Sequence, residues 1–214
     1  MTFDELREKM VREQLQPRGI TDPRVLGAFR KVPRHAFVPK AYQRDAYTDH
    51  PIPIGGGQTI SQPYMVALMT QLLRLQGHER VLEVGTGSGY QLAILAELAL
   101  DVYSVERFPE LADQAAERFE QLGYLNVHVV SGDGTLGWRE QAPYEGIVVT
   151  AGAPSIPMPL VQQLAEGGRL VIPIGRKEAQ TLTLIERRVD RLDIQEIAAC
   201  VFVPLVGEHG WPAA

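Results

Sequence analysis

The strongest constraint on the fold is the stretch Arg80–Gln91, which reads RVLEVGTGSGYQ. Its opening run RVLEV predicts a buried strand, Gly85, Gly87 and Gly89 predict a tight turn, and residues 91–100 predict a helix. Glycine suits a turn that packs against a ligand, because a residue without Cβ adopts positive φ angles and lets the ligand approach the main chain. The stretch therefore predicts a strand, a turn and a helix that cradle a nucleotide-sized molecule.

The same stretch discriminates between cofactors. The dinucleotide fingerprint G-x-G-x-x-G/A requires Gly or Ala at position 90, where this chain has Tyr90. NAD is thereby disfavoured without being excluded. With Glu83 placed before the three glycines, the stretch instead resembles the first motif of the class I S-adenosylmethionine-dependent methyltransferases. The three glycines alone would fit any Rossmann-like turn. The strand before them and the helix after them strengthen the resemblance to the methyltransferase motif.

Composition limits the classes of protein to which the chain could belong. A chain of 214 residues is long enough for one α/β domain with an extension. The net charge of -5 argues against binding to nucleic acid, because such surfaces are usually basic. The single cysteine, Cys200, allows no internal disulfide, and no basic leader precedes an apolar run, so we expect a cytoplasmic protein. No apolar run approaches the roughly 20 residues of a membrane-spanning helix.

Two helices are predicted before the first strand. Thr2 and Glu5 have capping-box spacing before an apolar helical face, and Asp22 followed by Pro23 marks the start of a second helix. The pair has two interpretations, a docking surface for a substrate or a helical cap over a sheet edge. The second is the more general one and is favoured here.

Residues 33–62 are predicted to be an irregular but ordered loop, since prolines and glycines interrupt it while aromatic residues recur. The loop leads to Ser61, which we expect to cap a following helix. The apolar residues of that helix are Met65, Leu68, Leu72 and Leu75. Ser61 has two compatible interpretations, a capping oxygen or a hydroxyl at a helix N-terminus that binds a carboxylate.

Acidic residues follow the next two predicted strands. Glu106 ends the strand at 102–105, about twenty residues beyond the glycine turn, where Rossmann-like folds place an acid on the ribose hydroxyls. Asp133 follows the strand at 127–130 within Ser-Gly-Asp-Gly. It is either an ordinary turn residue or an acid placed to reach the adenine amino group.

The rest of the chain continues the alternation of strands and helices. We expect helices at 109–122 and 160–166, and strands at 147–150, 170–174, 181–186 and 194–203. The pattern predicts an α/β fold, a Rossmann-like doubly wound and mostly parallel sheet with a C-terminal antiparallel hairpin and an N-terminal helical extension. We expect one domain over 1–214, with an extension at 1–62 and the Rossmann-like core at 63–214.

Five blocks in this order make the resemblance more specific. They are QTISQP at 58–63, the glycine block, SGDG at 131–134, GRLVIPIG at 168–175 and FVPL at 202–205. Over about residues 1–211, the chain resembles the protein-L-isoaspartate O-methyltransferases. The resemblance implies methyl transfer from S-adenosylmethionine to the α-carboxylate of L-isoaspartyl residues in damaged proteins and peptides, leaving S-adenosylhomocysteine. The methyl ester then collapses through a succinimide, which partly restores aspartate.

The resemblance also implies roles for individual residues. The catalytic-site hydroxyl is that of Ser61, the cofactor lies against the glycine turn, and the acceptor is held by Thr59, Ser61 and the backbone near Val206. The implied cofactor-binding residues are Thr59, Ile60, Ser61, Glu83, Gly85, Gly87, Gly89, Glu106, Asp133 and Gly134. Because the acceptor carboxylate is already ionised, no strong general base is needed. Ser61 is therefore expected to orient the acceptor rather than to attack.

Other chemistries lack their signatures. An adenine amino-group methyltransferase usually has Asp/Asn-Pro-Pro-aromatic where this chain has AGAP at 151–154, and Cys200 lacks the proline expected before a cytosine C5 nucleophile. No lysine follows the glycine turn, and the histidines show no metal-ligand spacing, so no metal is expected. A monomer without nucleic-acid or membrane partners is expected. A non-catalytic S-adenosylmethionine-binding module, or a methyltransferase acting on another small carboxylate, stays open.

Overall fold

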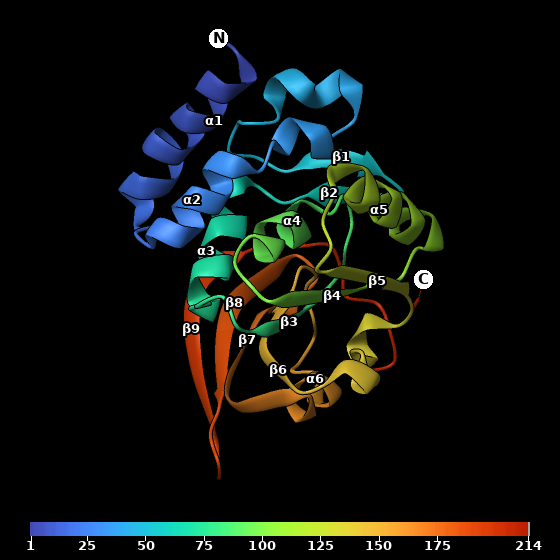
Figure 1. Ribbon diagram of the computed structural model, residues 1–214. Helices are drawn as coiled ribbons and strands as arrows, with labels where there is room; N and C mark the ends of the chain where they lie inside the picture. The colour runs from blue at the N-terminus through green and yellow to red at the C-terminus, as the bar shows by residue number, and fades with distance from the viewer. Residues whose placement is uncertain (214) are drawn as a thin grey trace.

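The computed structural model describes residues 1–213, and a sheet of seven strands lies at its centre (Figure 1). The strands are β3 (Arg80–Val84), β4 (Asp101–Glu106), β5 (Val127–Ser131), β6 (Tyr144–Val149), β7 (Leu164–Arg176), β8 (Ala179–Arg187) and β9 (Leu192–Cys200). Their spatial order is β5-β4-β3-β6-β7-β8-β9. The pairs from β5 to β7 are parallel, while β8 and β9 pair antiparallel. The predicted mostly parallel sheet with its antiparallel C-terminal hairpin is confirmed.

Strand β3 marks the point at which the sheet changes direction. The chain runs outward from β3 to β4 and β5, then returns to β6 on the other side of β3. Leu82 accordingly lies between Tyr103 of β4 and Ile147 of β6. In open parallel sheets, a crevice forms at the carboxyl ends of the strands at such a point, and it is the usual place for a ligand.

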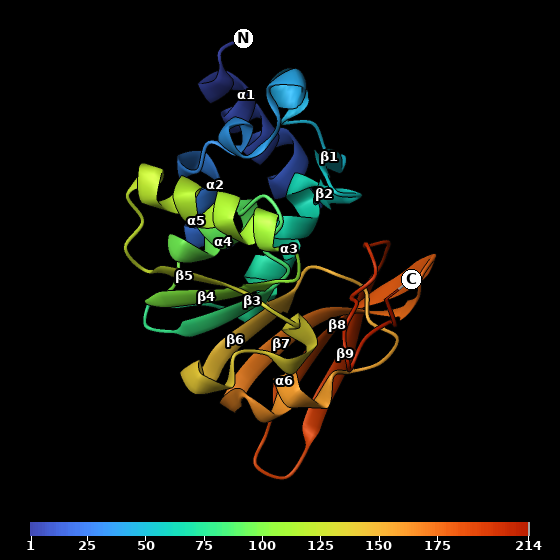
Figure 2. The ribbon, with the colours of Figure 1, turned by 90° about the vertical axis from the view of Figure 1, so that its right-hand side faces the viewer.

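Helices cover both faces of the sheet (Figure 2). Helices α3 (Pro63–Leu73), α4 (Tyr90–Ala96) and α5 (Pro109–Leu122) lie on one face, and α6 (Met158–Gln162) lies on the other with the turns η5 (Gly134–Leu136) and η6 (Arg139–Gln141). Alternate strand residues face the two layers, so Val81 and Leu82 belong to different buried clusters. The sheet is doubly wound, as predicted.

The N-terminal helices begin where the sequence predicts. Thr2 and Glu5 form the capping box of α1 (Phe3–Met10), which continues through η1 (Val11–Leu15) and η2 (Gln16–Arg18). The carboxylate of Asp22 caps α2 (Pro23–Lys31). None of the helices in residues 1–213 is both long and apolar enough to cross a bilayer.

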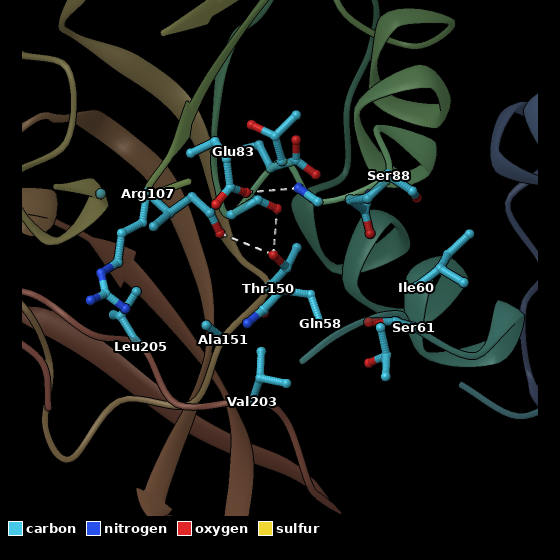
Figure 3. Close-up of a pocket in the computed structure, with 18 of the residues that line it drawn as sticks. Gln58, Ile60, Ser61, Glu83, Ser88, Arg107, Thr150, Ala151, Val203 and Leu205 are labelled. Atoms are coloured by element: carbon cyan, nitrogen blue, oxygen red, sulfur yellow. Dashed lines mark hydrogen bonds between the residues drawn. The ribbon is translucent and has the colours of Figure 1, made fainter. Parts of the chain in front are cut away.

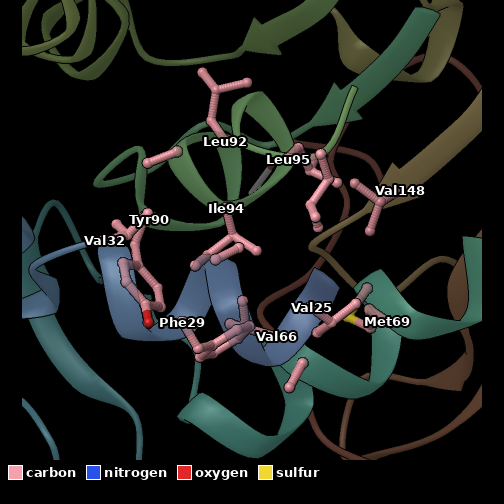
Figure 4. Close-up of a cluster of buried hydrophobic side chains, with 14 of the residues drawn as sticks. Val25, Phe29, Val32, Val66, Met69, Tyr90, Leu92, Ile94, Leu95 and Val148 are labelled. Carbon is pink, nitrogen blue, oxygen red and sulfur yellow. The ribbon is translucent and has the colours of Figure 1, made fainter. Parts of the chain in front are cut away.

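These helices form a layer outside α3 and α4, which corrects the expectation that they cap a sheet edge (Figure 2). Phe29 of α2 is fully buried, and its ring meets that of Tyr90 edge-on, with 6.0 Å between the centroids (Figure 4). Val25 and Val32 lie in the same cluster as Val66 and Ile94. The apolar face of α2 therefore packs against helices of the core.

Residues 33–62 are irregular and ordered, but they contain a hairpin that the sequence did not predict. The turns η3 (Arg34–Phe37) and η4 (Lys40–Asp45) precede the antiparallel pair β1 (Ile52–Gly55) and β2 (Gln58–Ile60). The hairpin turns through Gly55, Gly56 and Gly57, all with positive φ. Strand β2 delivers the chain directly to Ser61.

Several predicted boundaries are wrong. Strand β7, for example, begins at Leu164 rather than at residue 170. Helix α4 ends at Ala96 rather than at residue 100, and α6 ends at Gln162, because Leu164 already pairs with Tyr144 of β6. Strand β9 ends at Cys200 rather than at residue 203. The segment beyond β9 bends back instead, where Pro204 bridges to Gly152 beyond β6.

Candidate active site

A cavity opens at the carboxyl ends of β3, β4 and β6, at the change of direction in the sheet (Figure 3). Most of the predicted site residues line it: Thr59, Ile60, Ser61, Glu83, Gly85, Gly87, Glu106, Gly134 and Val206. Two predicted residues, Gly89 and Asp133, do not belong to its wall. Segments distant in the sequence therefore meet around one cavity, which we call the first cavity.

The glycine turn forms the floor between β3 and α4. Gly85, Gly87 and Gly89 all have positive φ, at 96°, 52° and 86°. A Cβ on Gly85 would lie 2.5 Å from Oγ1 of Thr150, and that hydroxyl donates to the carbonyl of Gly85 at 2.7 Å. The turn thus packs directly against the end of β6. Gly89 is the N-cap of α4, where a Cβ would lie 2.9 Å from the ring of Phe119, so its role here is packing.

The carboxyl group of Glu83 is fully buried in the cavity wall. Its Oε2 accepts a hydrogen bond from Oγ of Ser104 at 2.8 Å, while Oε1 has no hydrogen-bond partner among the described residues. Burial raises the pKa of Glu83 well above its usual range; the Ser104 hydrogen bond opposes this, and the nearby Glu106 charge adds to it. A cationic ligand group in the cavity would supply the missing partner.

Glu106 lies at the end of β4, beside the glycine turn. Its Oε2 accepts from the backbone N-H of Gly87 at 2.8 Å, and its Oε1 accepts from that of Phe108 at 3.0 Å. These bonds fix the carboxylate in one orientation. Each oxygen keeps acceptor capacity for a ligand hydroxyl.

Both carboxylate oxygens of Asp133 accept hydrogen bonds from other residues of the protein. Its Oδ1 accepts from the backbone N-H and the hydroxyl of Thr135, at 2.9 and 2.7 Å, and its Oδ2 accepts from the N-H of Glu208 at 2.8 Å. Burial alone raises the pKa of Asp133, but these hydrogen bonds outweigh it and lower the pKa. The carboxylate joins the end of β5 to the C-terminal segment. Its contact with adenine stays a prediction.

Ser61 lies on a different side of the cavity from Glu83 (Figure 3). The prediction that it caps α3 is wrong, because the N-cap is Gln62 and makes no side-chain capping bond. The helix starts one residue later at Pro63, which has no N-H, and the N-H of Tyr64 donates to Oδ1 of Asp49 at 3.0 Å. Within residues 1–213, the Ser61 hydroxyl makes no hydrogen bond and is available to a ligand.

A second cavity adjoins the first between α3 and the β8–β9 hairpin. Both cavities are lined by Thr59, Ser61, Thr150 and Val203. The second continues past Pro51, Gln62, Met65, Ala179, Gln180, Ala199, Cys200, Val201 and Phe202. Ser61 thus borders a compartment on either side.

Some residues of the walls had no predicted role. Thr150 and Arg107 line the first cavity, and both follow strands of the parallel sheet, which is a signal that the sequence contains. Residues 203–205 reach the cavity through the bridge between Pro204 and Gly152, a tertiary contact without a local signal. The described residues contain no group of histidine, cysteine or acidic side chains that would hold a metal ion.

Comparisons with known proteins agree with this geometry. Residues 5–210 match the model of the family described as protein-L-isoaspartate(D-aspartate) O-methyltransferase. The protein-L-isoaspartate O-methyltransferase 1 of Syntrophobacter fumaroxidans is 56% identical over 211 residues, which cover 99% of each chain. The protein-L-isoaspartate O-methyltransferase of Methanoculleus marisnigri is 55% identical, over 96% of this chain and 93% of the relative.

Solved structures show the same similarity. A protein-L-isoaspartate O-methyltransferase structure superposes with a TM-score of 0.86 and 32% identity, covering 95% of this chain and 67% of the other. A Plasmodium falciparum structure, described as a protein-L-isoaspartate O-methyltransferase in complex with S-adenosyl-L-homocysteine, gives a TM-score of 0.81 and 26% identity. That superposition covers 96% of this chain and 99% of the other.

Proposed function

The chain belongs to the protein-L-isoaspartate(D-aspartate) O-methyltransferase family, and we propose that its two joined cavities divide the reaction between them. The first cavity holds S-adenosylmethionine. The second admits the isoaspartyl residue of a damaged protein or peptide, whose α-carboxylate meets the cofactor where the cavities join. One observation carries this assignment: the Ser61 hydroxyl, free of protein partners, lies at the junction.

The residues of the first cavity fit the chemical groups of S-adenosylmethionine. The free oxygen of Glu83 suits its cationic methionine end, next to Gly85 and Gly87. Glu106 is positioned to accept from the ribose hydroxyls, and Gly134 of the wall is assigned to the adenine. Asp133 lies outside the wall, so its assignment to the adenine rests on the family resemblance alone. Gly89 contributes by holding the turn against α5. When bound, the cofactor supplies an electrophilic methyl group on a sulfonium.

The second cavity suits an acceptor that is already ionised. A carboxylate needs no strong base at neutral pH, so the task of the protein is alignment. Ser61 donates a hydrogen bond that orients the carboxylate, with Thr59 also at the junction of the cavities and the backbone of Val206 in the wall of the first cavity. Apolar wall residues such as Met65 and Phe202 exclude water, which favours a reaction in which charge is lost. The released methyl ester then closes to a succinimide, as the adjoining backbone amide nitrogen attacks the ester carbonyl and methanol leaves.

The surroundings of the site bear on its partners. We propose the monomer as the active form. The net charge of -5 argues against nucleic acid as a partner. We place the protein in the cytoplasm, where isoaspartyl residues of intracellular proteins are repaired. Light scattering of the purified protein at assay concentrations tests the monomer directly.

Methyl transfer to matched peptides tests the proposed function. The protein is incubated with methyl-labelled S-adenosylmethionine and two peptides that differ only in an isoaspartyl or aspartyl linkage. We expect label in the isoaspartyl peptide alone. Binding of S-adenosylhomocysteine without labelling of either peptide would instead indicate a non-catalytic module. Labelling of free small carboxylates, but of neither peptide, would indicate a different acceptor.

A further inference from the structure

Arg34 is a charged side chain of the N-terminal extension that the structure buries completely, with 0% exposure. Its Nε donates to the carbonyl oxygen of Ala46 at 2.6 Å, and its Nη2 donates to the carbonyl oxygen of Ser61 at 2.7 Å. Its Nη1 has no hydrogen-bond partner in the described chain. None of the ion pairs within residues 1–213 includes Arg34. The guanidinium therefore holds two backbone carbonyls without a carboxylate partner.

Burial of an arginine without a carboxylate partner is unfavourable for stability. Removing a cation from water costs several kcal/mol, and an apolar residue of similar volume often fills a buried site at no loss of stability. Burial lowers the pKa of Arg34 to about 10, so the side chain is still a cation at neutral pH. What the guanidinium adds is a rigid, planar set of donors that fixes two acceptors at once.

The position of Arg34 links both sides of the first cavity. Its Cζ lies 4.7 Å from the ring centroid of Tyr90, the first residue of α4 and part of the cavity wall. On the other side it bonds Ser61, which with Gln62 forms the link between β2 and α3. A displacement of the Ser61 main chain would carry the Ser61 side chain with it. The hydrogen bond from Arg34 to the Ser61 carbonyl opposes that displacement.

We propose that Arg34 is a positioning residue, which fixes the Ser61 backbone so that the Ser61 hydroxyl points to the junction of the two cavities. This inference rests on the proposed function, in which that hydroxyl orients the acceptor carboxylate. Arg34 does not border either cavity and touches neither ligand. Its contribution to the reaction passes through Ser61.

The chain offers a matched control in Arg24. Like Arg34, this arginine belongs to the extension and binds two backbone carbonyls, but its acceptors lie in the core: Nη1 donates to Leu75 and Nη2 to Leu98, both at 3.2 Å. None of these three residues lines the first or the second cavity. Replacing Arg24 likewise removes two hydrogen bonds to backbone carbonyls, although Arg24 is only partly buried, and it does not touch the Ser61 segment.

The experiment compares Arg34→Gln, Arg34→Lys and Arg24→Gln, each alone and combined with Ser61→Ala. It measures kcat on the isoaspartyl peptide and the Kd of S-adenosylhomocysteine by calorimetry, at a temperature where circular dichroism shows a folded protein. We expect Arg34→Gln to lower kcat about tenfold or more, because small misplacements of reacting groups have large effects on rate, while Kd changes less than about threefold. Arg34→Lys, which keeps one charged donor, should retain part of the activity.

Coupling to Ser61 separates positioning from stability. In the Ser61→Ala background, Arg34→Gln should lower kcat by no more than about twofold, because residues that act through one group are not additive. Arg24→Gln should leave kcat within about twofold in both backgrounds. If Arg34→Gln does not fold, Arg34→Lys is carried through the same comparison.

Two results would overturn the positioning role. The first is that Arg34→Gln and Arg24→Gln lower kcat by the same factor. The second is that Arg34→Gln lowers kcat by the same factor in the Ser61→Ala background as in the wild-type protein. Either would make Arg34 a purely structural residue. Failure of the proposed function is a distinct result, since the wild-type protein would then not label the isoaspartyl peptide.

Discussion

At the scale of single residues, Ser61 is the group whose replacement tests the mechanism most directly. Ser61→Ala removes only the hydroxyl at the junction of the cavities. We expect kcat to fall by roughly ten- to a hundredfold, because a misaligned acceptor carboxylate reacts more slowly, with little change in cofactor affinity. Steady-state kinetics and calorimetry with S-adenosylhomocysteine measure the two quantities.

A variant that keeps the hydroxyl provides the comparison for Ser61. Ser61→Thr retains a donor on the same backbone and should preserve more turnover than Ser61→Ala. Equal losses of turnover and cofactor affinity in Ser61→Ala would assign Ser61 to binding or folding instead of orientation.

Glu83 makes stability depend on pH in a defined direction. Because burial raises its pKa, the folded protein binds this proton more tightly than the unfolded chain does, where Glu titrates near pH 4.3. The stabilisation is therefore complete below about pH 4.3 and is lost as pH rises through the folded-state pKa. Glu83→Gln lacks this titration. Without cofactor, the variant should gain unfolding free energy relative to wild type as the pH rises above about 4.3.

Urea unfolding of both proteins at several pH values measures this difference. The glutamine side chain of the variant would keep an oxygen to accept from Ser104, so the packing of the variant stays close to that of wild type. Parallel profiles for the two proteins would show that Glu83 does not titrate abnormally.

At the scale of secondary-structure elements, local signals were sufficient for some boundaries only. Helix α5 has the predicted bounds, since Pro109 and the positive-φ Gly123 mark its ends within the segment itself. Helix α6 ends early because Leu164 pairs with a strand some twenty residues away, a contact that no local pattern encodes. Ser61 fails to cap α3 for the same kind of reason, because Asp49 of a distant loop takes that place.

The site also contains residues that local sequence patterns indicated and residues that they did not. The residues that the glycine motif and the strand ends indicated, such as Glu83 and Glu106, line the first cavity. The second cavity and the role of Arg34 had no sequence signal. The second cavity depends on contacts between the extension and the core. The proposed role of Arg34 depends on a bond within the extension, from Arg34 to Ser61 across 27 positions of the chain.

The junction between the glycine turn and α5 gives a test at this scale. Gly89→Ala and Gly123→Ala both place a side chain at positive φ, which is unfavourable by about 1 to 2 kcal/mol. At Gly123 no atom lies within 4 Å of the new Cβ, whereas at Gly89 the ring of Phe119 lies at 2.9 Å. That ring packs against Phe37 and Tyr124 and has little room to move.

Gly89→Ala should therefore destabilise the protein by about 1 to 3 kcal/mol more than Gly123→Ala, as overpacked cores do. Denaturant midpoints of the two variants measure the difference. Similar losses would mean that α5 shifts to accommodate the methyl group, and the close contact would then contribute nothing to stability.

At the scale of the whole molecule, we propose that residues 1–62 and 63–214 form one domain. One buried cluster contains Met10 and Phe29 from the extension together with Leu92 and Val148 from the core. The extension also supplies Ser61 and Arg34, to which we assign the orientation of the acceptor. Because the two parts share one core, we expect them to unfold together.

Phe29→Ala tests this cooperativity. Phe29 belongs to the extension, whereas both tryptophans, Trp138 and Trp211, belong to the core. Loss of a fully buried phenylalanine should lower the unfolding free energy by about 3 to 5 kcal/mol, and in a single domain the midpoints from tryptophan fluorescence and circular dichroism should fall together. Phe3→Ala is the control, since Phe3 is 36% exposed, and it should lower stability far less. The extension unfolds as a separate unit if the fluorescence midpoint of Phe29→Ala equals that of wild type while circular dichroism shows an additional transition at lower denaturant concentration.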